Sequence, residues 1–346
     1  MVKMQEKTIV WGIIGCGEVA EVKSGPAFQK TNNSELIAVM RRDALKAEDF
    51  ASRHHVPFWY SEASELLKNE KINAVYIATP PSTHLEYALQ ALKAGKDVYL
   101  EKPMVVSADE AVILSQAVQE HSNKLVVAHY RRYLPAFLKV KELLDEKAIG
   151  DIRFIDLKFL QPSNTDLISK SGDNWRVNPE VSGGGYFHDI APHQIDLMQY
   201  FFGDYNKAVG FAANQEGKFR TDDIVNGLIQ FKNSIQFRGL WSFNISAKEK
   251  QDNCTIYGSL GTISFSFYGE EVKVMHEDET VSIKFKNPLH VQQPMIQQTV
   301  NYFLSKRDNP CDVEAGLKVT QIMDIFCKNQ KKNLVFRIIR KVYFFK

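Results

Sequence analysis

The chain has 346 residues, of which 44% are hydrophobic and 24% charged, a composition typical of folded globular proteins and not of disordered or fibrous ones. This length exceeds that of one ordinary hydrophobic core and predicts two domains. With 43 Lys and Arg against 41 Asp and Glu, the formal net charge of +2 gives no reason to expect nucleic acid or an anionic membrane as a partner. We therefore expect a small-molecule ligand.

The spacing of the cysteines indicates whether a metal site is expected, and the length of the apolar segments indicates where the protein is located. The four cysteines are scattered without any C-x-x-C spacing, so we expect neither a metal site nor a disulfide framework. The apolar segment TIVWGIIG near the start is too short for the core of a signal peptide. No later segment approaches the roughly 20 apolar residues of a membrane span. These features predict a soluble, cytoplasmic protein with no membrane contact.

Residues 1–148 alternate short apolar runs with longer stretches of helical periodicity. Runs that are apolar throughout are typical of parallel strands buried on both faces, and helices between them complete a β-α-β series. We therefore predict a Rossmann dinucleotide-binding domain, in an α/β protein. The predicted strands cover residues 8–15, 35–40, 73–80, 97–103 and 124–129.

Residues 149–330 follow a different pattern, with longer strands that alternate apolar and polar residues. This alternation predicts an α+β domain with a large open, mostly antiparallel sheet that serves substrate binding and oligomerisation. Helices are expected from about Ile190 to Phe202 and from Glu314 to about Cys327. Residues 331–346 form a tail for which the sequence predicts no role.

The N-terminal strand is followed by Gly15-x-Gly17-x-x-Ala20, which opens a helix. Gly15 permits a tight turn, Gly17 lets the backbone approach a pyrophosphate, and Ala20 allows close packing of helix on strand. This context predicts a dinucleotide site with Gly15, Gly17, Glu18 and Val19 in contact with the cofactor.

The second strand ends in Met40, Arg41 and Arg42, where an NAD enzyme commonly places Asp or Glu against the ribose hydroxyls. A guanidinium group binds phosphate through a planar fork of donors, so Arg41 and Arg42 favour NADP over NAD. The alternative is that both arginines are solvated at the start of the next helix and that Asp43 is its N-cap.

Two further strand ends carry polar residues at the carboxyl edge, where doubly wound sheets bind ligands. Thr79, Pro80 and His84 lie at or just after the end of the predicted strand at 73–80, and Glu101 and Lys102 lie at the end of the one at 97–103. We predict cofactor contacts for all five. A capping or buried structural role is an equal alternative for His84. Partial burial would lower the pKa of Lys102 and let it polarise a substrate oxygen.

The glycine loop, ATPPSTH, EKP and GGGYFHDIAPHQID, in this order, resemble the Gfo/Idh/MocA oxidoreductase family. The resemblance runs from about residue 8 to residue 325. It implies a Rossmann domain followed by an α/β domain with an open sheet, and substrates that are mostly sugars, cyclitols and related diols. It also implies that Lys102, Asp189 and His193 form the catalytic group.

In GGGYFHDIAPHQID, Asp189, His193 and Asp196 are spaced i, i+4 and i+7, which places them on one face of a helix starting near His188. His193 is the best candidate for the general acid/base, because imidazole titrates near neutrality. Asp189 is expected to bind a neighbouring substrate hydroxyl. Glycines 183–185 are expected to let the helix approach substrate and cofactor closely.

The predicted reaction is reversible hydride transfer between nicotinamide C4 and a carbinol or carbonyl carbon. Other interpretations are a metal-dependent phosphohydrolase, which would need further ligands that the sequence lacks, and a structural role for His193 and Asp196. A nucleotide-binding regulator without turnover and a dehydrogenase of aromatic dihydrodiols also remain open.

Four other residues are plausible ligand contacts, with ordinary packing or surface charge as the alternative for each. Tyr130 and Arg131 follow the predicted strand at 124–129 and are candidates for the substrate. Trp175 and Arg176 precede the glycine turn and are candidates for the substrate or the cofactor. The apolar face of the open sheet predicts a homodimer or homotetramer.

Overall fold

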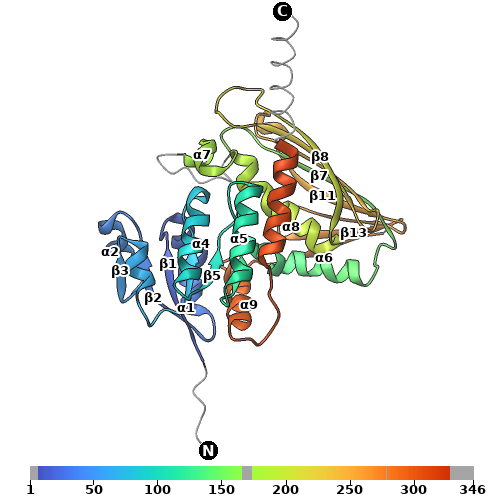
Figure 1. Ribbon diagram of the computed structural model, residues 1–346. Coiled ribbons are helices and arrows are strands. Elements are labelled where there is room, and N and C mark those ends of the chain that lie inside the picture. Colours follow the sequence, from blue (N-terminus) through green and yellow to red (C-terminus); the bar gives the residue numbers. More distant parts are fainter. Residues whose placement is uncertain (1–6, 166–173, 278, 328–346) are drawn as a thin grey trace, which may run out of the picture. The chain divides into compact units, whose positions relative to one another are not determined.

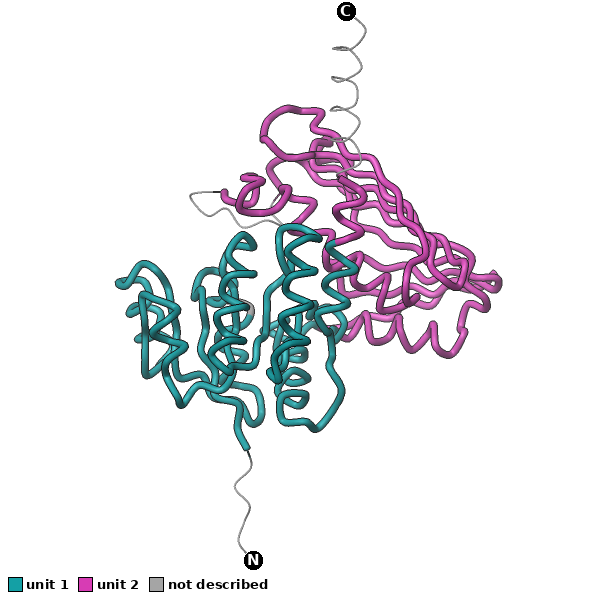
Figure 2. Tube along the Cα trace, viewed as in Figure 1, with its two compact units in different colours: residues 1–134, 287–320 teal, residues 135–286, 321–346 magenta. Residues whose placement is uncertain are grey.

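The computed structural model describes residues 7–165, 174–277 and 279–327, so the predicted tail at 331–346 lies outside the described residues. The chain divides into two compact units, which Figure 2 colours separately. Unit 1 comprises residues 1–134 and 287–320, and unit 2 comprises residues 135–286 and 321–346. This division differs from the predicted boundary at 148/149 in two ways: residues 135–148 belong to unit 2, and residues 287–320 return to unit 1.

Unit 1 contains a six-stranded, fully parallel sheet in the order β3-β2-β1-β4-β5-β6. This is the strand order of a Rossmann fold, and the order reverses between β1 and β4. The predicted fold class is therefore confirmed. The strands are β1 (Ile9–Ile14), β2 (Ser34–Met40), β3 (Phe58–Tyr60), β4 (Ala74–Ile77), β5 (Asp97–Leu100) and β6 (Leu125–Val127).

Helices connect these strands, and Figure 1 shows α4 and α5 side by side. The chain after the glycine loop first forms a short π-helical turn (Ala20–Ser24) and only then α1. Asp43 accepts a hydrogen bond from the backbone N–H of Lys46 at 3.2 Å, which confirms its interpretation as an N-cap. The α-helices are α1 (Gly25–Lys30), α2 (Ala44–Arg53), α3 (Ala63–Leu67), α4 (His84–Lys93), α5 (Ala108–Glu120) and α9 (Gln293–Phe303).

The core of unit 1 is rich in aromatic rings. The ring of Trp11 lies 4.8 Å from that of Phe28 and 5.7 Å from that of Phe303, between centroids. The rings of Tyr76 and Tyr99 stack at 5.3 Å. Because Phe303 belongs to α9, the returning segment completes the core around β1.

Unit 2 contains an eight-stranded sheet in the order β14-β13-β12-β11-β7-β10-β9-β8. β7 and β10 pair in parallel and the other neighbours are antiparallel, which confirms the predicted mostly antiparallel sheet. The strands are β7 (Ile152–Leu160), β8 (Tyr205–Ala213), β9 (Ile224–Phe231), β10 (Gln236–Ser242), β11 (Gln251–Gly258), β12 (Thr262–Phe265), β13 (Glu271–His276) and β14 (Glu279–Lys284).

The long helix α8 covers one face of this sheet (Figure 1). The ring of Phe187 lies 5.2 Å from that of Trp241, and the Trp241 indole N–H donates to the Gln194 side chain at 2.5 Å. The helices of unit 2 are α6 (Pro135–Asp145), α7 (Pro179–Ser182) and α8 (Tyr186–Phe202), with a 3-10 turn η4 (Trp175–Val177). A further helix covers residues 313–327, as predicted.

The opposite face of the sheet in unit 2 exposes large apolar side chains. Phe211 on β8 is 64% exposed and Leu228 on β9 is 53% exposed. Val209 pairs directly with Leu228, so the two strands carry one continuous apolar surface. Among the described residues, no helix has both the length and the apolar character needed to cross a membrane.

Candidate active site

Helix α8 carries the residues that the sequence predicted as the chemical centre. Asp189, which is partly exposed, lies one turn before His193, whose side chain is 3% exposed. Asp196 is 1% exposed and follows on the same face. The helix begins at Tyr186, earlier than the predicted start near His188.

Asp189 forms an ion pair with Arg176. The Arg176 Nε donates to Asp189 Oδ2 at 3.2 Å, and the guanidinium carbon lies 4.6 Å from the centroid of the Trp175 ring. Arg176 is 8% exposed. It is therefore packed on one side and hydrogen-bonded on the other, which fixes the orientation of the Asp189 carboxylate. Sequence reasoning selected Trp175 and Arg176 as ligand contacts but did not find this pair.

The three glycines before α8 also have local structural roles within unit 2. Gly183 ends α7 with a positive φ of 86°. A Cβ on Gly184 would lie 2.2 Å from the His188 ring, and one on Gly185, whose φ is also 86°, would lie 2.5 Å from Thr221. Turn geometry and packing against side chains of the same unit therefore favour glycine here, and the predicted approach to substrate and cofactor stays a prediction.

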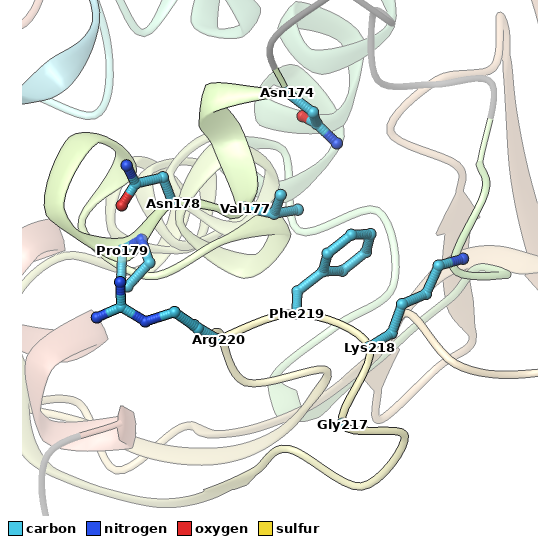
Figure 3. A pocket seen from close by; sticks show the side chains of 8 residues that line it. All are labelled: Asn174, Val177, Asn178, Pro179, Gly217, Lys218, Phe219 and Arg220. Atoms are coloured by element: carbon cyan, nitrogen blue, oxygen red, sulfur yellow. The ribbon is translucent and has the colours of Figure 1, made fainter.

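A pocket of about 390 Å³ lies in unit 2 beside the segment that carries Arg176. One wall comes from η4 and α7 and the other from the loop between β8 and β9, as Figure 3 shows. No sequence motif predicted this pocket. Its lining residues are Asn174, Val177, Asn178, Pro179, Gly217, Lys218, Phe219 and Arg220.

In unit 1 the glycine loop follows β1 at the point where the strand order reverses. Gly15 has a φ of 96°, and a Cβ there would lie 2.8 Å from the backbone N and the side chain of Thr79. The loop after β1 therefore packs directly on the loop after β4. Only glycine meets both demands.

Gly17 has open space in front of it, since among the described residues no heavy atom other than those of Gly17 and its two chain neighbours lies within 4 Å of a Cβ placed on it. Glu18 is exposed, and Val19 is partly exposed. The backbone of this loop can therefore be approached closely, which is the shape that a dinucleotide pyrophosphate requires. The residues present fit NAD or NADP.

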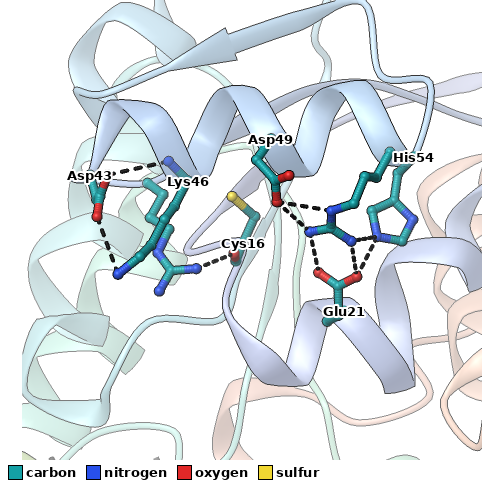
Figure 4. Close-up of polar contacts among 8 residues, drawn as sticks. Cys16, Glu21, Asp43, Lys46, Asp49 and His54 are labelled. Carbon is teal, nitrogen blue, oxygen red and sulfur yellow. Dashed lines mark hydrogen bonds and ion pairs between the residues drawn. The ribbon is translucent and has the colours of Figure 1, made fainter. Parts of the chain in front are cut away.

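Arg41 lies beside this loop and donates to the carbonyl oxygen of Cys16 at 3.4 Å, a contact shown in Figure 4. Arg42 is exposed. Cys16 is buried, and this burial raises the pKa of its thiol to about 11, so the thiol stays protonated. Arg41 and Arg42 thus directly follow β2, and their contact with a 2′-phosphate stays a prediction.

The helical turn after the glycine loop is tied to α2 by Glu21 (Figure 4). The Glu21 carboxylate accepts from Arg53 at 3.1 Å and contacts the His54 Nε2 at 2.8 Å, while Arg53 also binds Asp49 at 2.9 Å. The hydrogen bond from Arg53 is the main reason that the pKa of Glu21 is lowered. This network fixes the helical turn Ala20–Ser24 that follows the glycine loop, and sequence reasoning missed it.

Glu101, predicted as a cofactor contact, is 6% exposed and is bonded within unit 1. Its carboxylate accepts from the Tyr76 hydroxyl at 2.5 Å, from the Gln292 side chain at 2.6 Å and from the backbone N–H of Lys102 at 3.0 Å. Burial, followed by the Glu101 charge, raises the pKa of Tyr76 well above its usual value, so Tyr76 remains a donor. Glu101 thus anchors the loop that carries Lys102.

His84 ties the same loop to the end of β4. Its Nδ1 lies 2.9 Å from the carbonyl oxygen of Pro103 and its Nε2 lies 2.8 Å from that of Thr79. The ring is fully buried, and burial is the main reason that its pKa is lowered. These contacts favour the structural alternative for His84. Lys102, half-buried, is thus held on both sides by buried polar groups.

Tyr130 and Arg131, the predicted substrate contacts in unit 1, are 6% and 5% exposed. The Arg131 guanidinium lies 5.6 Å from the centroid of the Tyr130 ring. The neighbouring Arg132 donates to the carbonyl oxygen of Pro310 at 3.0 Å. These contacts place the segment in the interior of unit 1, and its role toward substrate stays a prediction.

Within the described ranges, no group of three or more His, Cys, Asp or Glu side chains is arranged to hold a metal ion. The candidate catalytic side chains described above belong to the loop of Lys102 in unit 1 and to α8 in unit 2. Each set is held by hydrogen bonds within its own unit.

Comparison with known proteins agrees with this geometry. Residues 9–129 match the model of the oxidoreductase family with an NAD-binding Rossmann fold, and residues 137–264 match the GFO/IDH/MocA C-terminal domain. The chain is 55% identical to Oxidoreductase P35 of Formosa agariphila over 93% of this chain and 99% of that protein.

Two more distant proteins share part or all of the architecture. The trans-1,2-dihydrobenzene-1,2-diol dehydrogenase of Xenopus laevis is 31% identical over 56% of each chain. The aldose-aldose oxidoreductase of Caulobacter crescentus, crystallised with glycerol, superposes with a TM-score of 0.81 at 18% identity, over 92% of this chain and 96% of that one. With both family domains matched in order along the chain, this protein belongs to the Gfo/Idh/MocA family of NAD(P)-dependent oxidoreductases.

Proposed function

We propose that the protein transfers a hydride between nicotinamide C4 and a carbinol or carbonyl carbon of a sugar, cyclitol or related polyol. One observation supports this proposal most strongly. Asp189 forms an ion pair with Arg176, and on helix α8 it lies one turn before His193. This arrangement offers a fixed hydrogen-bond acceptor and a titratable imidazole to adjacent hydroxyl groups of one substrate.

When bound, the nicotinamide accepts or supplies the hydride. His193 takes the proton from the reacting hydroxyl in one direction and returns it to the carbonyl oxygen in the other. Lys102 stabilises the negative charge that develops on that oxygen. Asp189, oriented by Arg176, accepts a hydrogen bond from the neighbouring hydroxyl and so selects vicinal hydroxyl groups.

The same proposal includes a preference for NADP, which gives a testable expectation for Arg41. Arg41→Ala should weaken NADPH binding about tenfold while leaving NADH binding nearly unchanged, because only NADPH carries the phosphate that a guanidinium group binds. Titration of the purified protein with each nucleotide, followed by nicotinamide fluorescence, measures both affinities. Lys46→Ala, at an exposed lysine of α2, is the matched control.

Equal loss of affinity for both nucleotides would contradict this assignment. It would mean that Arg41 acts only through its contact with the Cys16 carbonyl oxygen, by shaping the glycine loop.

A second candidate substrate is an aromatic dihydrodiol, since the Xenopus laevis relative is named as a dehydrogenase of that class. The same three side chains would serve it. A screen of sugars, cyclitols and trans-dihydrodiols with the preferred nucleotide separates the two. Nucleotide binding without turnover of any of them would favour a regulatory protein.

We also propose that the exposed face of the sheet in unit 2 forms a homodimer or homotetramer. Exposed apolar patches of this kind normally bind a partner. The double variant Phe211→Asp/Leu228→Asp should therefore be monomeric, while the wild type is not. Multi-angle light scattering at micromolar concentration measures this, and a monomeric wild type would disprove the proposal.

A further inference from the structure

We propose that the pocket between η4, α7 and the β8–β9 loop binds an acidic substituent of the saccharide substrate, either a carboxylate or a sulfate ester. This inference rests on the proposed function and specifies its substrate class.

The pocket wall formed by the β8–β9 loop is built in advance of any ligand. The Asn214 side chain donates to the carbonyl oxygen of Phe219 at 2.6 Å and accepts from the backbone N–H of Gly217 at 2.9 Å. The Asp223 carboxylate accepts from the backbone N–H groups of Gln215 at 2.9 Å and Glu216 at 2.7 Å. A loop ordered in this way loses little conformational entropy when a ligand binds.

The charges that line the pocket have one sign. Among the described residues, its two ionisable lining side chains are Lys218 and Arg220, and no carboxylate lines it. The Lys218 ammonium donates to the neutral hydroxyl of Ser163 at 3.1 Å. Arg220 pairs with Glu180 at 3.0 Å, but both side chains are at least 70% exposed, so this pair is weak and the guanidinium can serve a ligand as well. The pocket therefore favours an anion.

The remaining lining residues suit a sugar ring. Phe219, near the centre of Figure 3, offers an apolar surface for ring C–H groups. Asn174 donates to the Tyr186 hydroxyl at 2.9 Å, while its buried Oδ1 accepts no hydrogen bond from the described residues. A buried carbonyl oxygen of this kind calls for a donor, and a ligand hydroxyl supplies one.

The pocket is close to the candidate catalytic helix α8 both along the chain and through a side-chain contact. Asn174 and Val177 flank Arg176, which holds Asp189. The Phe219 ring contacts that of Tyr186, the first residue of α8, at 5.9 Å between centroids. A substrate whose neighbouring hydroxyl is bound by Asp189 can therefore extend an acidic group toward Lys218 and Arg220.

The test compares D-glucuronate, D-glucose 6-sulfate and D-glucose by isothermal titration calorimetry on the full chain at low ionic strength. We expect at least one of the two acidic sugars to bind about tenfold more tightly than glucose, because charge-assisted hydrogen bonds are the stronger ones. The double variant Lys218→Gln/Arg220→Gln should lose this preference. Lys232→Gln, which removes an exposed, ion-paired lysine elsewhere in unit 2, should keep it.

Tighter binding of glucuronate identifies a carboxylate as the group recognised, and tighter binding of the sulfate identifies a sulfate ester. Equal binding of all three sugars, or a preference that survives the double substitution, overturns the proposal. Nucleotide binding is measured separately by fluorescence. A protein that prefers acidic sugars through Lys218 and Arg220 but binds no NADPH retains this pocket while the proposed function fails.

Discussion

Replacement of His193 by Asn should lower kcat by about 10²- to 10⁴-fold, the usual contribution of a positioned general acid/base. The Asn side chain occupies part of the volume of the imidazole ring, but its amide group cannot take a proton from the substrate hydroxyl. Nucleotide affinity should be unchanged, because the residues predicted to hold the dinucleotide backbone lie in the glycine loop. Stopped-flow measurement of nicotinamide absorbance, with the first active substrate from the screen, gives the rate.

Because His193 is 3% exposed, the control is thermal unfolding followed by circular dichroism. His193→Gln serves as a second variant in case the first is destabilised. A folded variant whose kcat falls by less than about threefold would remove His193 from the chemical step.

Replacement of Lys102 by Met should lower kcat by roughly 10²- to 10³-fold, since it removes the cation that stabilises the developing alkoxide. The side chain keeps nearly the same length, so packing changes little. Lys102→Arg retains the charge and should lose less activity than Lys102→Met. The rates come from steady-state kinetics with each variant.

If Lys102→Met and Lys102→Arg lowered kcat equally, Lys102 would not act through its charge. That result would assign the effect to the shape of the loop, which Glu101 and His84 hold through buried hydrogen bonds.

Much of the fold could be predicted because the relevant signals are local. The apolar runs located β1, β2, β4, β5 and β6, and alternation located β7, β9 and β10. β3 was missed because it has only three residues, and Phe58 and Trp59 in it are about 40% exposed. The return of residues 287–320 to unit 1 was missed because periodicity identifies a helix but not the core on which it packs.

In the candidate site, too, local sequence signals were predictive and contacts between distant residues were not. Glycine spacing, the Glu-Lys-Pro motif and helical spacing located Gly15, Lys102 and His193 without a structure. The partners that fix them were not predictable, since Gln292 lies 191 residues from Glu101 in the sequence. The pairing of Arg176 with Asp189 likewise joins two different elements, and no spacing rule relates them.

The return of α9 to unit 1 also determines when that unit can fold during synthesis. Phe303 contributes to the core around Trp11, and Gln292 binds the buried Glu101. The ribosome must therefore translate all of residues 135–286 before the nucleotide-binding unit can close its core. Domains usually fold in order as they emerge. Here the segment before residue 135 belongs to a unit that waits for residues 287–320, which are synthesised later.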